Sequence, residues 1–160
     1  GIGLAVVAAF FFLKRNKKVD KKEEKTNKIP EHLVAKAQGY FNQLCFLFKV
    51  KTIPVNDHVF DDKSGAFFQG YCKEVCPNVE LNLITPETLE SVIVHEFTHY
   101  LMFLNHIPEV NHNTNFQEKL GEVITRYYSQ NGRKYSLLQE YEWVKLYLRT
   151  HLKDRSRYLA

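Results

Sequence analysis

The stretch VIVHEFTHYL, residues 92–101, decides how this chain is interpreted. Six apolar residues in and around it recur at helical spacing: Leu89, Val92, Ile93, Phe97, Leu101 and Leu104. This spacing predicts a helix, on which His95 and His99 share one face and can reach a single ion. Glu96 is then placed to accept a proton from water beside that ion. The HExxH pattern thus predicts a catalytic zinc site with His95 and His99 as ligands and Glu96 as base.

The elements around this helix predict an α+β domain. Thr85-Pro86-Glu87 is typical of a helix start, so we expect the HExxH helix to begin there. Further helices are predicted from Pro30 to about 48 and over about 115–130 and 136–153, and short strands over about 52–60, 66–71 and 79–83. Alternation of apolar and polar residues in VELNL, residues 79–83, favours one buried sheet face. We therefore expect an N-terminal helix, a three-stranded antiparallel-type sheet, the HExxH helix and two further helices.

The N-terminal segment differs from the rest. Residues 1–13, GIGLAVVAAFFFL, are apolar and are followed directly by KRNKK. The run is shorter than the ~20 residues that span a bilayer, so we expect it to be part of a longer single-pass anchor. Its positive flank predicts that the following chain lies on the cytoplasmic side. Residues 14–29 are expected to form a flexible basic tether, and residues 30–155 the folded domain.

Composition and charge exclude several classes of protein. A chain of 160 residues with 44% hydrophobic and 14% aromatic residues is one folded domain rather than a disordered segment. Eight basic and three acidic residues lie between Lys14 and Lys28, which leaves 14 basic and 15 acidic residues elsewhere. A body with this balance lacks the charge of a nucleic-acid-binding domain. Cys72 and Cys76 lack two further ligands, so they do not predict a structural zinc site.

Two segments resemble the zincin metallopeptidases. VIVHEFTHYL after the strand VELNL resembles zincins, in which an edge strand lies beside the HExxH helix. LGEVITRYY, residues 120–128, resembles the gluzincin pattern NEGxxEYx, although Gly121 replaces the usual Asn and Val123 the usual small residue. The resemblance implies a minimal gluzincin in which Glu122 is the third zinc ligand.

Two other residues compete with Glu122 as the third ligand. Glu118 has the spacing after His99 of the aminopeptidase-type HExxH-x18-E motif. His112 lies in HNTNF, which resembles the HGxxF segment of SprT-like proteases, where a histidine is the third ligand. Glu122 is preferred because it lies beside the apolar stripe of its predicted helix, whereas Glu118 points away from that stripe.

The predicted function is a membrane-tethered zinc metallopeptidase acting on a peptide or protein substrate, with no nucleic-acid partner. Residues 79–83 are expected to hold an extended substrate by strand addition. The alternative is a catalytically inactive zincin-fold protein that binds a partner or has a structural role at a membrane. No motif indicates a bond preference or an oligomeric state.

Overall fold

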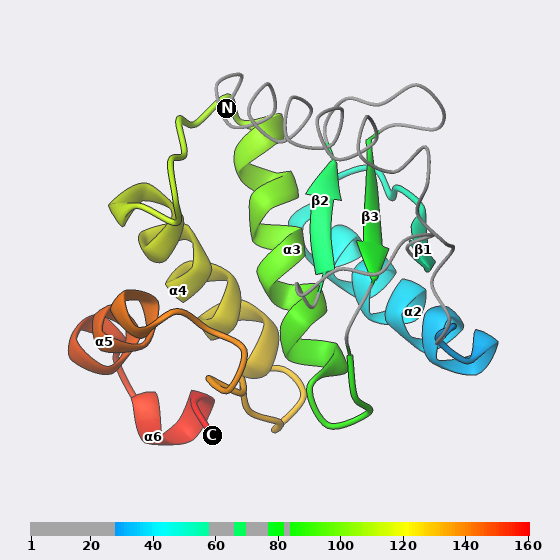
Figure 1. Cartoon of the computed structure of the whole chain (residues 1–160). Coiled ribbons are helices and arrows are strands. Elements are labelled where there is room, and N and C mark those ends of the chain that lie inside the picture. Colours follow the sequence, from blue (N-terminus) through cyan, green and yellow to red (C-terminus); the bar gives the residue numbers. More distant parts are fainter. Residues whose placement is uncertain (1–27, 58–65, 70–76, 82–83) are drawn as a thin grey trace, which may run out of the picture.

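The computed structural model describes residues 28–57, 66–69, 77–81 and 84–160 (Figure 1). The elements follow in the order α2 (Glu31–Phe48), β1 (Val55–Asp57), β2 (Ala66–Gln69), β3 (Asn78–Leu81), α3 (Leu89–Leu104), α4 (Thr114–Tyr128), α5 (Glu142–His151) and the short α6 (Arg155–Tyr158). The HExxH sequence lies in α3, which stands between the sheet and α4 (Figure 1).

The expectation of a single-pass membrane anchor is not supported. Among the described residues, no helix is both long enough and apolar enough to cross a bilayer. The apolar run of residues 1–13 and the tether up to residue 27 lie outside the described residues. We therefore withdraw the anchor and, with it, the expected cytoplasmic placement of the domain.

The sheet is mixed, so the prediction of an antiparallel-type sheet is wrong. Its strand order is β1-β3-β2. β1 runs parallel to β3, with Val55 opposite Val79, whereas β2 runs antiparallel to β3, with Ala66 opposite Leu81. The alternation in VELNL reports which face of a strand is buried, and it carries no information on the direction of the neighbouring strand. The direction of β1 relative to β3 depends instead on the path of the chain between these two strands.

The segment before β1 is held by α2, and this shortens the predicted strand. Pro54 has no N–H to donate, and its carbonyl accepts a hydrogen bond from Val79 N at 2.9 Å. The Gln38 side chain accepts from Val55 N at 2.7 Å and donates to the Ile53 carbonyl at 3.1 Å. Residues 52–54, predicted as strand, are therefore bonded to a helix side chain and to β3.

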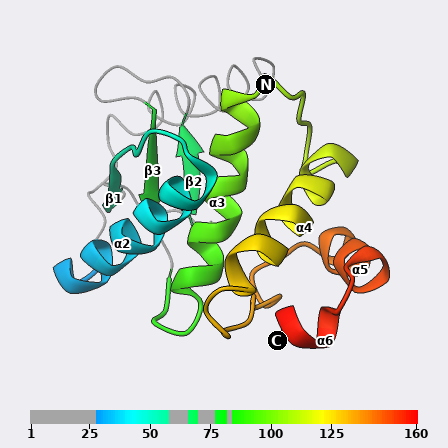
Figure 2. The ribbon, with the colours of Figure 1, turned by 180° about the vertical axis from the view of Figure 1, so that it is seen from behind.

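Helix α2 packs against the sheet and α3 (Figure 2), and its buried residues belong to the hydrophobic core. Its residues Ala37, Phe41 and Leu44 are fully buried. The Phe41 ring meets the Phe97 ring of α3 edge to face, with centroids 5.6 Å apart. This packing fixes the face of α3 that turns toward the core, and thereby the face that carries His95 and His99.

Helix α3 begins three residues later than its sequence predicts, with Thr88 rather than Thr85 as the N-cap residue. Thr85 and Thr88 form a turn in which Thr88 N donates to the Thr85 carbonyl at 3.1 Å and the two hydroxyls lie 3.0 Å apart. The residues expected to cap the helix are therefore used in the turn that leads into it. From Leu89 onward α3 is largely buried, so the polar residues on it need partners inside the protein.

The last predicted helix is also shorter than expected, because residues 135–141 are used differently. Tyr135 forms an isolated parallel bridge with Leu159: Tyr135 N donates to the Tyr158 carbonyl at 2.7 Å, and Ala160 N to the Tyr135 carbonyl at 2.9 Å. Helix α5 begins only at Glu142. The fold continues beyond residue 155, where the domain was expected to end, because Tyr158 and Leu159 are buried.

Candidate metal centre

Three histidine side chains converge at the surface between α3 and α4. His95 and His99 come from α3, and His112 comes from the loop that joins the two helices. His95 Nε2 lies 3.1 Å from His99 Nε2 and 3.2 Å from His112 Nε2. All three residues are of intermediate burial, and the side chains of His95 and His99 are 14% and 11% exposed.

The spacing of the nitrogens fits one metal ion. Zinc binds imidazole nitrogen at ~2.0–2.1 Å with tetrahedral geometry, which places neighbouring ligand atoms about 3.3 Å apart. The observed separations of 3.1 and 3.2 Å are close to that value. A group of three ligands also leaves the fourth tetrahedral position for water, as catalytic zinc sites do.

The Phe116 ring packs against all three imidazole rings. It is fully buried in the first turn of α4. Its ring stacks on His99, with centroids 4.5 Å apart and planes 26° apart, and its centroid lies 4.9 Å from those of His95 and His112. One rigid aromatic ring therefore restricts the orientation of all three histidines.

The backbone of the connecting loop turns His112 toward α3. Asn111 and His112 are both left-handed, with φ of 48° and 57°. Consecutive non-glycine residues rarely adopt this conformation, and such strain clusters at functional sites. The His112 carbonyl accepts from Gln117 Nε2 at 2.8 Å, and Asn113 caps α4 by accepting from Phe116 N at 3.2 Å. These bonds hold the loop in the turn that presents His112.

Two buried carboxylates contact the outer nitrogens of the α3 histidines. Glu140 Oε1 lies 2.6 Å from His95 Nδ1, and Glu109 Oε1 lies 2.5 Å from His99 Nδ1, the latter as an ion-pair contact without hydrogen-bond geometry. The Glu140 and Glu109 side chains are 1% and 2% exposed. A carboxylate on Nδ1 favours the tautomer with its proton there, which leaves the Nε2 lone pair free for a metal.

The roles of Glu109 and Glu140 were not predicted from the sequence. Glu109 stands in the polar loop before His112, and Glu140 falls in a stretch predicted as amphipathic helix. The only local signal is an acidic residue in the otherwise largely apolar stretch LLQEY, residues 137–141, and that pattern is common on helices. Their roles depend on contacts with α3, which sequence spacing does not encode.

The charges around the site favour a cation. Burial would lower the pKa of His95, but the neighbouring Glu140 carboxylate outweighs it and raises that pKa to about 9. Burial would raise the pKa of Glu140, but the charge and hydrogen bond of His95 outweigh it and lower that pKa to about 2. For His112, burial together with the charges of His99 and His95 lowers the pKa to about 3, so its ring is neutral.

Glu96 is buried beside these histidines with an unused acceptor. The residue is 5% exposed, and its Oε2 has no hydrogen-bond partner within the described part of the chain. Burial raises the pKa of Glu96, although the charges of His99 and His95 act against that. Leaving a buried acceptor unpaired is costly, so the position suits a donor such as water at the metal site.

The predicted ligand Glu122 is not part of this group. Its Oε2 pairs with Lys119 Nζ at 3.0 Å, and its side chain is 49% exposed. Glu118 is exposed as well. The buried stripe of α4 consists of residues such as Leu120, Val123 and Tyr127, and Glu122 lies outside it. The geometry therefore favours His112, the histidine alternative, as third ligand.

The expected substrate strand is not available either. Residues 78–81 form β3, which has β1 on one side and β2 on the other. Both edges of β3 are therefore already paired, so no peptide can be added there. In the described sheet β2 is the edge strand on the side of α3 (Figure 1).

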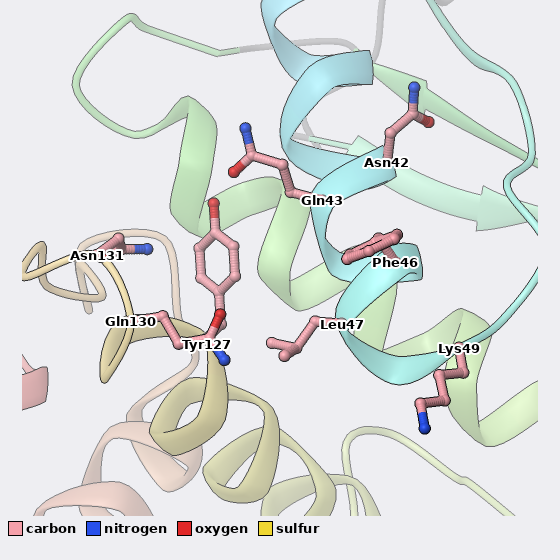
Figure 3. Close-up of a pocket in the computed structure, with 8 residues that line it drawn as sticks. All are labelled: Asn42, Gln43, Phe46, Leu47, Lys49, Tyr127, Gln130 and Asn131. Carbon is pink, nitrogen blue, oxygen red and sulfur yellow. The ribbon is translucent and has the colours of Figure 1, made fainter.

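A separate groove between α2 and the end of α4 lacks the chemistry of the histidine site (Figure 3). Its volume is about 740 Å³, and it is lined by Asn42, Gln43, Phe46, Leu47, Lys49, Tyr127, Gln130 and Asn131. No acidic residue or histidine is among them, so the groove offers neither a carboxylate nor an imidazole ligand.

No family model, no curated protein and no solved structure matches this chain. What it is able to do must therefore be argued from the site. The described residues that define this site are His95, His99, His112, Glu96, Glu109 and Glu140, of which the last two support the first two.

Proposed function

We propose that this protein is a zinc-dependent hydrolase that cleaves peptide bonds, with zinc held by His95, His99 and His112. The observation that carries the proposal is the convergence of three imidazole Nε2 atoms, with neighbouring atoms 3.1 and 3.2 Å apart. The buried Glu96, one residue from His95, supports a catalytic role over a purely structural one.

The donor set supports zinc over other common ions. Calcium and magnesium prefer oxygen ligands, whereas imidazole nitrogen suits zinc and its transition-metal neighbours. The Glu140 carboxylate contacts His95 Nδ1, so Nε2 is the ring nitrogen of His95 that faces His99 and His112.

Each residue then has a defined task. Bound zinc supplies Lewis-acid polarisation of a carbonyl and lowers the pKa of its water to ~7. Glu96 accepts the proton of the attacking water and returns it to the departing amine. Glu140 and Glu109 hold the outer nitrogens of His95 and His99, which keeps their lone pairs directed at the ion.

The number of ligands supports hydrolysis over a structural metal site. Structural zinc sites are closed by four protein ligands, whereas catalytic ones have three and an open position. Among the residues that the structure describes, the metal-binding group consists of three histidines.

The test combines metal analysis with digestion of an unfolded substrate. We expect the full chain to carry about one zinc per molecule and to degrade denatured casein. 1,10-Phenanthroline should stop the digestion, and added zinc should restore it. The matched control is His32→Ala, which removes an exposed histidine of α2 and should change neither property. Metal uptake without any chelator-sensitive cleavage of protein or peptide substrates would refute the hydrolase.

A further inference from the structure

Two aromatic side chains form an exposed stacked pair at the start of α5. The rings of Tyr141 and Trp143 have centroids 4.6 Å apart and planes 13° apart. Tyr141 is 50% exposed and Trp143 is 48% exposed. We call these two residues the aromatic pair. Large aromatic surface that is left in water and held rigid is typical of a binding surface.

The aromatic pair is attached directly to the histidine site. The Tyr141 ring centroid lies 4.8 Å from that of His112. Tyr141 also follows Glu140, whose carboxylate contacts His95 at 2.6 Å. A group bound on the aromatic pair would therefore lie beside any ligand held at the three histidines.

Other exposed apolar side chains gather along the same segments. Seven large hydrophobic residues are exposed in the described chain, and Val110, Leu138, Tyr141 and Trp143 stand within three positions of Glu109 or Glu140. Val110 is 65% exposed and Leu138 79%. Four of the seven exposed residues thus lie close in sequence to the two carboxylates of the site, and Tyr141 is in direct contact with His112.

The charge next to the aromatic pair is neutralised. Glu142 lies between Tyr141 and Trp143 in the chain, and its Oε1 pairs with Lys145 Nζ at 2.9 Å. The carboxylate between the two aromatic residues in the chain is thus ion-paired, and the aromatic side chains themselves carry no charge. Such a surface binds apolar or aromatic side chains through burial and ring stacking.

We propose that Tyr141 and Trp143 bind a large apolar or aromatic side chain of the substrate, next to the bond that is cleaved. This inference rests on the proposed function, because it assigns the substrate class of the same site. Apolar contacts of this size discriminate between substrates by roughly 10–200-fold. Peptides with Phe or Leu at this position are then cleaved in preference to those with Ser or Asp.

The test uses two hydroxamates, which bind a metal through the same group and differ only in the side chain. Acetohydroxamate carries a methyl group and 3-phenylpropionohydroxamate an aromatic ring. We expect the zinc-loaded full chain to bind the aromatic compound at least about tenfold more tightly. Trp143 is the single tryptophan of the chain, so its fluorescence should change with the aromatic ligand. Calorimetry gives both affinities.

Variants separate the aromatic pair from other exposed apolar residues. Tyr141→Ala should bring the ratio of the two hydroxamate affinities close to one. Trp143→Ala, measured by calorimetry, should also lower this ratio. The second variant keeps the test decisive if Tyr141→Ala folds poorly. Leu146→Ala, which removes a 67% exposed residue of α5 outside the pair, should leave the ratio unchanged. Equal affinity of the two hydroxamates for the wild type, or an unchanged ratio in both aromatic variants, overturns the inference.

Metal content and casein digestion, measured on the same preparation, distinguish the two proposals. An aromatic preference without cleavage supports the aromatic pair and refutes the hydrolase. Cleavage without a preference refutes the aromatic pair alone. A protein that takes up no zinc and binds neither hydroxamate overturns both.

Discussion

Helix α3 carries two polar clusters that differ in how completely their atoms are paired. In the Glu90 cluster, Arg133 donates to both carboxylate oxygens of Glu90 at 2.6–3.0 Å, and Tyr127 OH donates to Oε2 at 2.8 Å. In the histidine cluster, by contrast, Oε2 of both Glu96 and Glu140 is buried without a hydrogen-bond partner among the described residues.

The comparison separates a structural polar cluster from one that is open to a ligand. The Glu90 cluster joins α3 to the end of α4 and to the following loop, and its cation is Arg133, part of the chain itself. The histidine cluster has buried carboxylates and three convergent nitrogens, an arrangement that could hold an added metal cation. Substitutions in the two clusters should therefore differ in what they change: zinc binding and cleavage in one, stability in the other.

The largest effect is expected from His112→Ala. Loss of one of three ligands should weaken zinc binding by well over the roughly 100-fold typical of a supporting residue. Zinc affinity is measured by chelator competition, with Glu122→Ala and Glu118→Ala as comparison variants that should stay close to wild type. If Glu122→Ala proves the most damaging instead, the third ligand comes from α4 and the site rearranges on metal binding.

Glu96→Gln should lower the rate of peptide cleavage by roughly 10²–10⁴-fold. Glutamine has nearly the shape of glutamate but cannot accept the proton of water. Zinc content should stay at the wild-type level, because Glu96 is not among the three converging ligands. A variant that retains zinc and cleaves at a rate within a few-fold of wild type would assign the base to another residue.

Glu140→Gln should weaken zinc binding by roughly 10–100-fold, less than loss of a ligand. The amide no longer supplies a negative charge at His95 Nδ1. The ring is then less firmly oriented, and its Nε2 is less basic. Tyr135→Phe sharpens the test, since the Tyr135 hydroxyl also binds Glu140. It should cause a smaller loss of the same sign. An unchanged affinity in Glu140→Gln would show that this carboxylate serves only the fold.

A substitution in the Glu90 cluster should have the smallest effect, and it should change the stability of the fold rather than the binding of zinc. Arg133→Ala is expected to lower the free energy of unfolding by about 1 kcal/mol, because Arg133 is half exposed and its ion pair is screened by water. Zinc affinity should not change. Urea denaturation and chelator competition measure the two quantities separately. A marked loss of zinc affinity would mean that the two clusters are coupled along α3.

The part of the site encoded by local spacing was predictable. His95, Glu96 and His99 lie within one helix turn, and the apolar pattern around them identifies that helix. The third histidine of the cluster was not predicted, because local context ranked Glu122 above His112 as the candidate third ligand. The left-handed turn that presents His112 has no glycine to mark it in the sequence.

The roles of the supporting carboxylates and the strand directions of the sheet could not be predicted from sequence spacing, for a related reason. Glu109 and Glu140 reach the histidines through tertiary packing, one from the α3–α4 loop and the other from the segment bonded to residues 158–160. The parallel pairing of β1 with β3 likewise joins segments that are not adjacent in the chain. Apolar periodicity describes one element at a time, so it does not specify such contacts.

Because His112 comes from a loop, the three histidines come together in two stages as the protein folds. His95 and His99 come together as soon as α3 forms, whereas His112 reaches them only when residues 105–113 have closed over the helix. An ion held by all three would act as a crosslink between α3 and the start of α4, and would restrict the unfolded chain in the way a disulfide across a short loop does. Metal would then dissociate by opening of this loop, and the same crosslink would protect the loop from proteolysis.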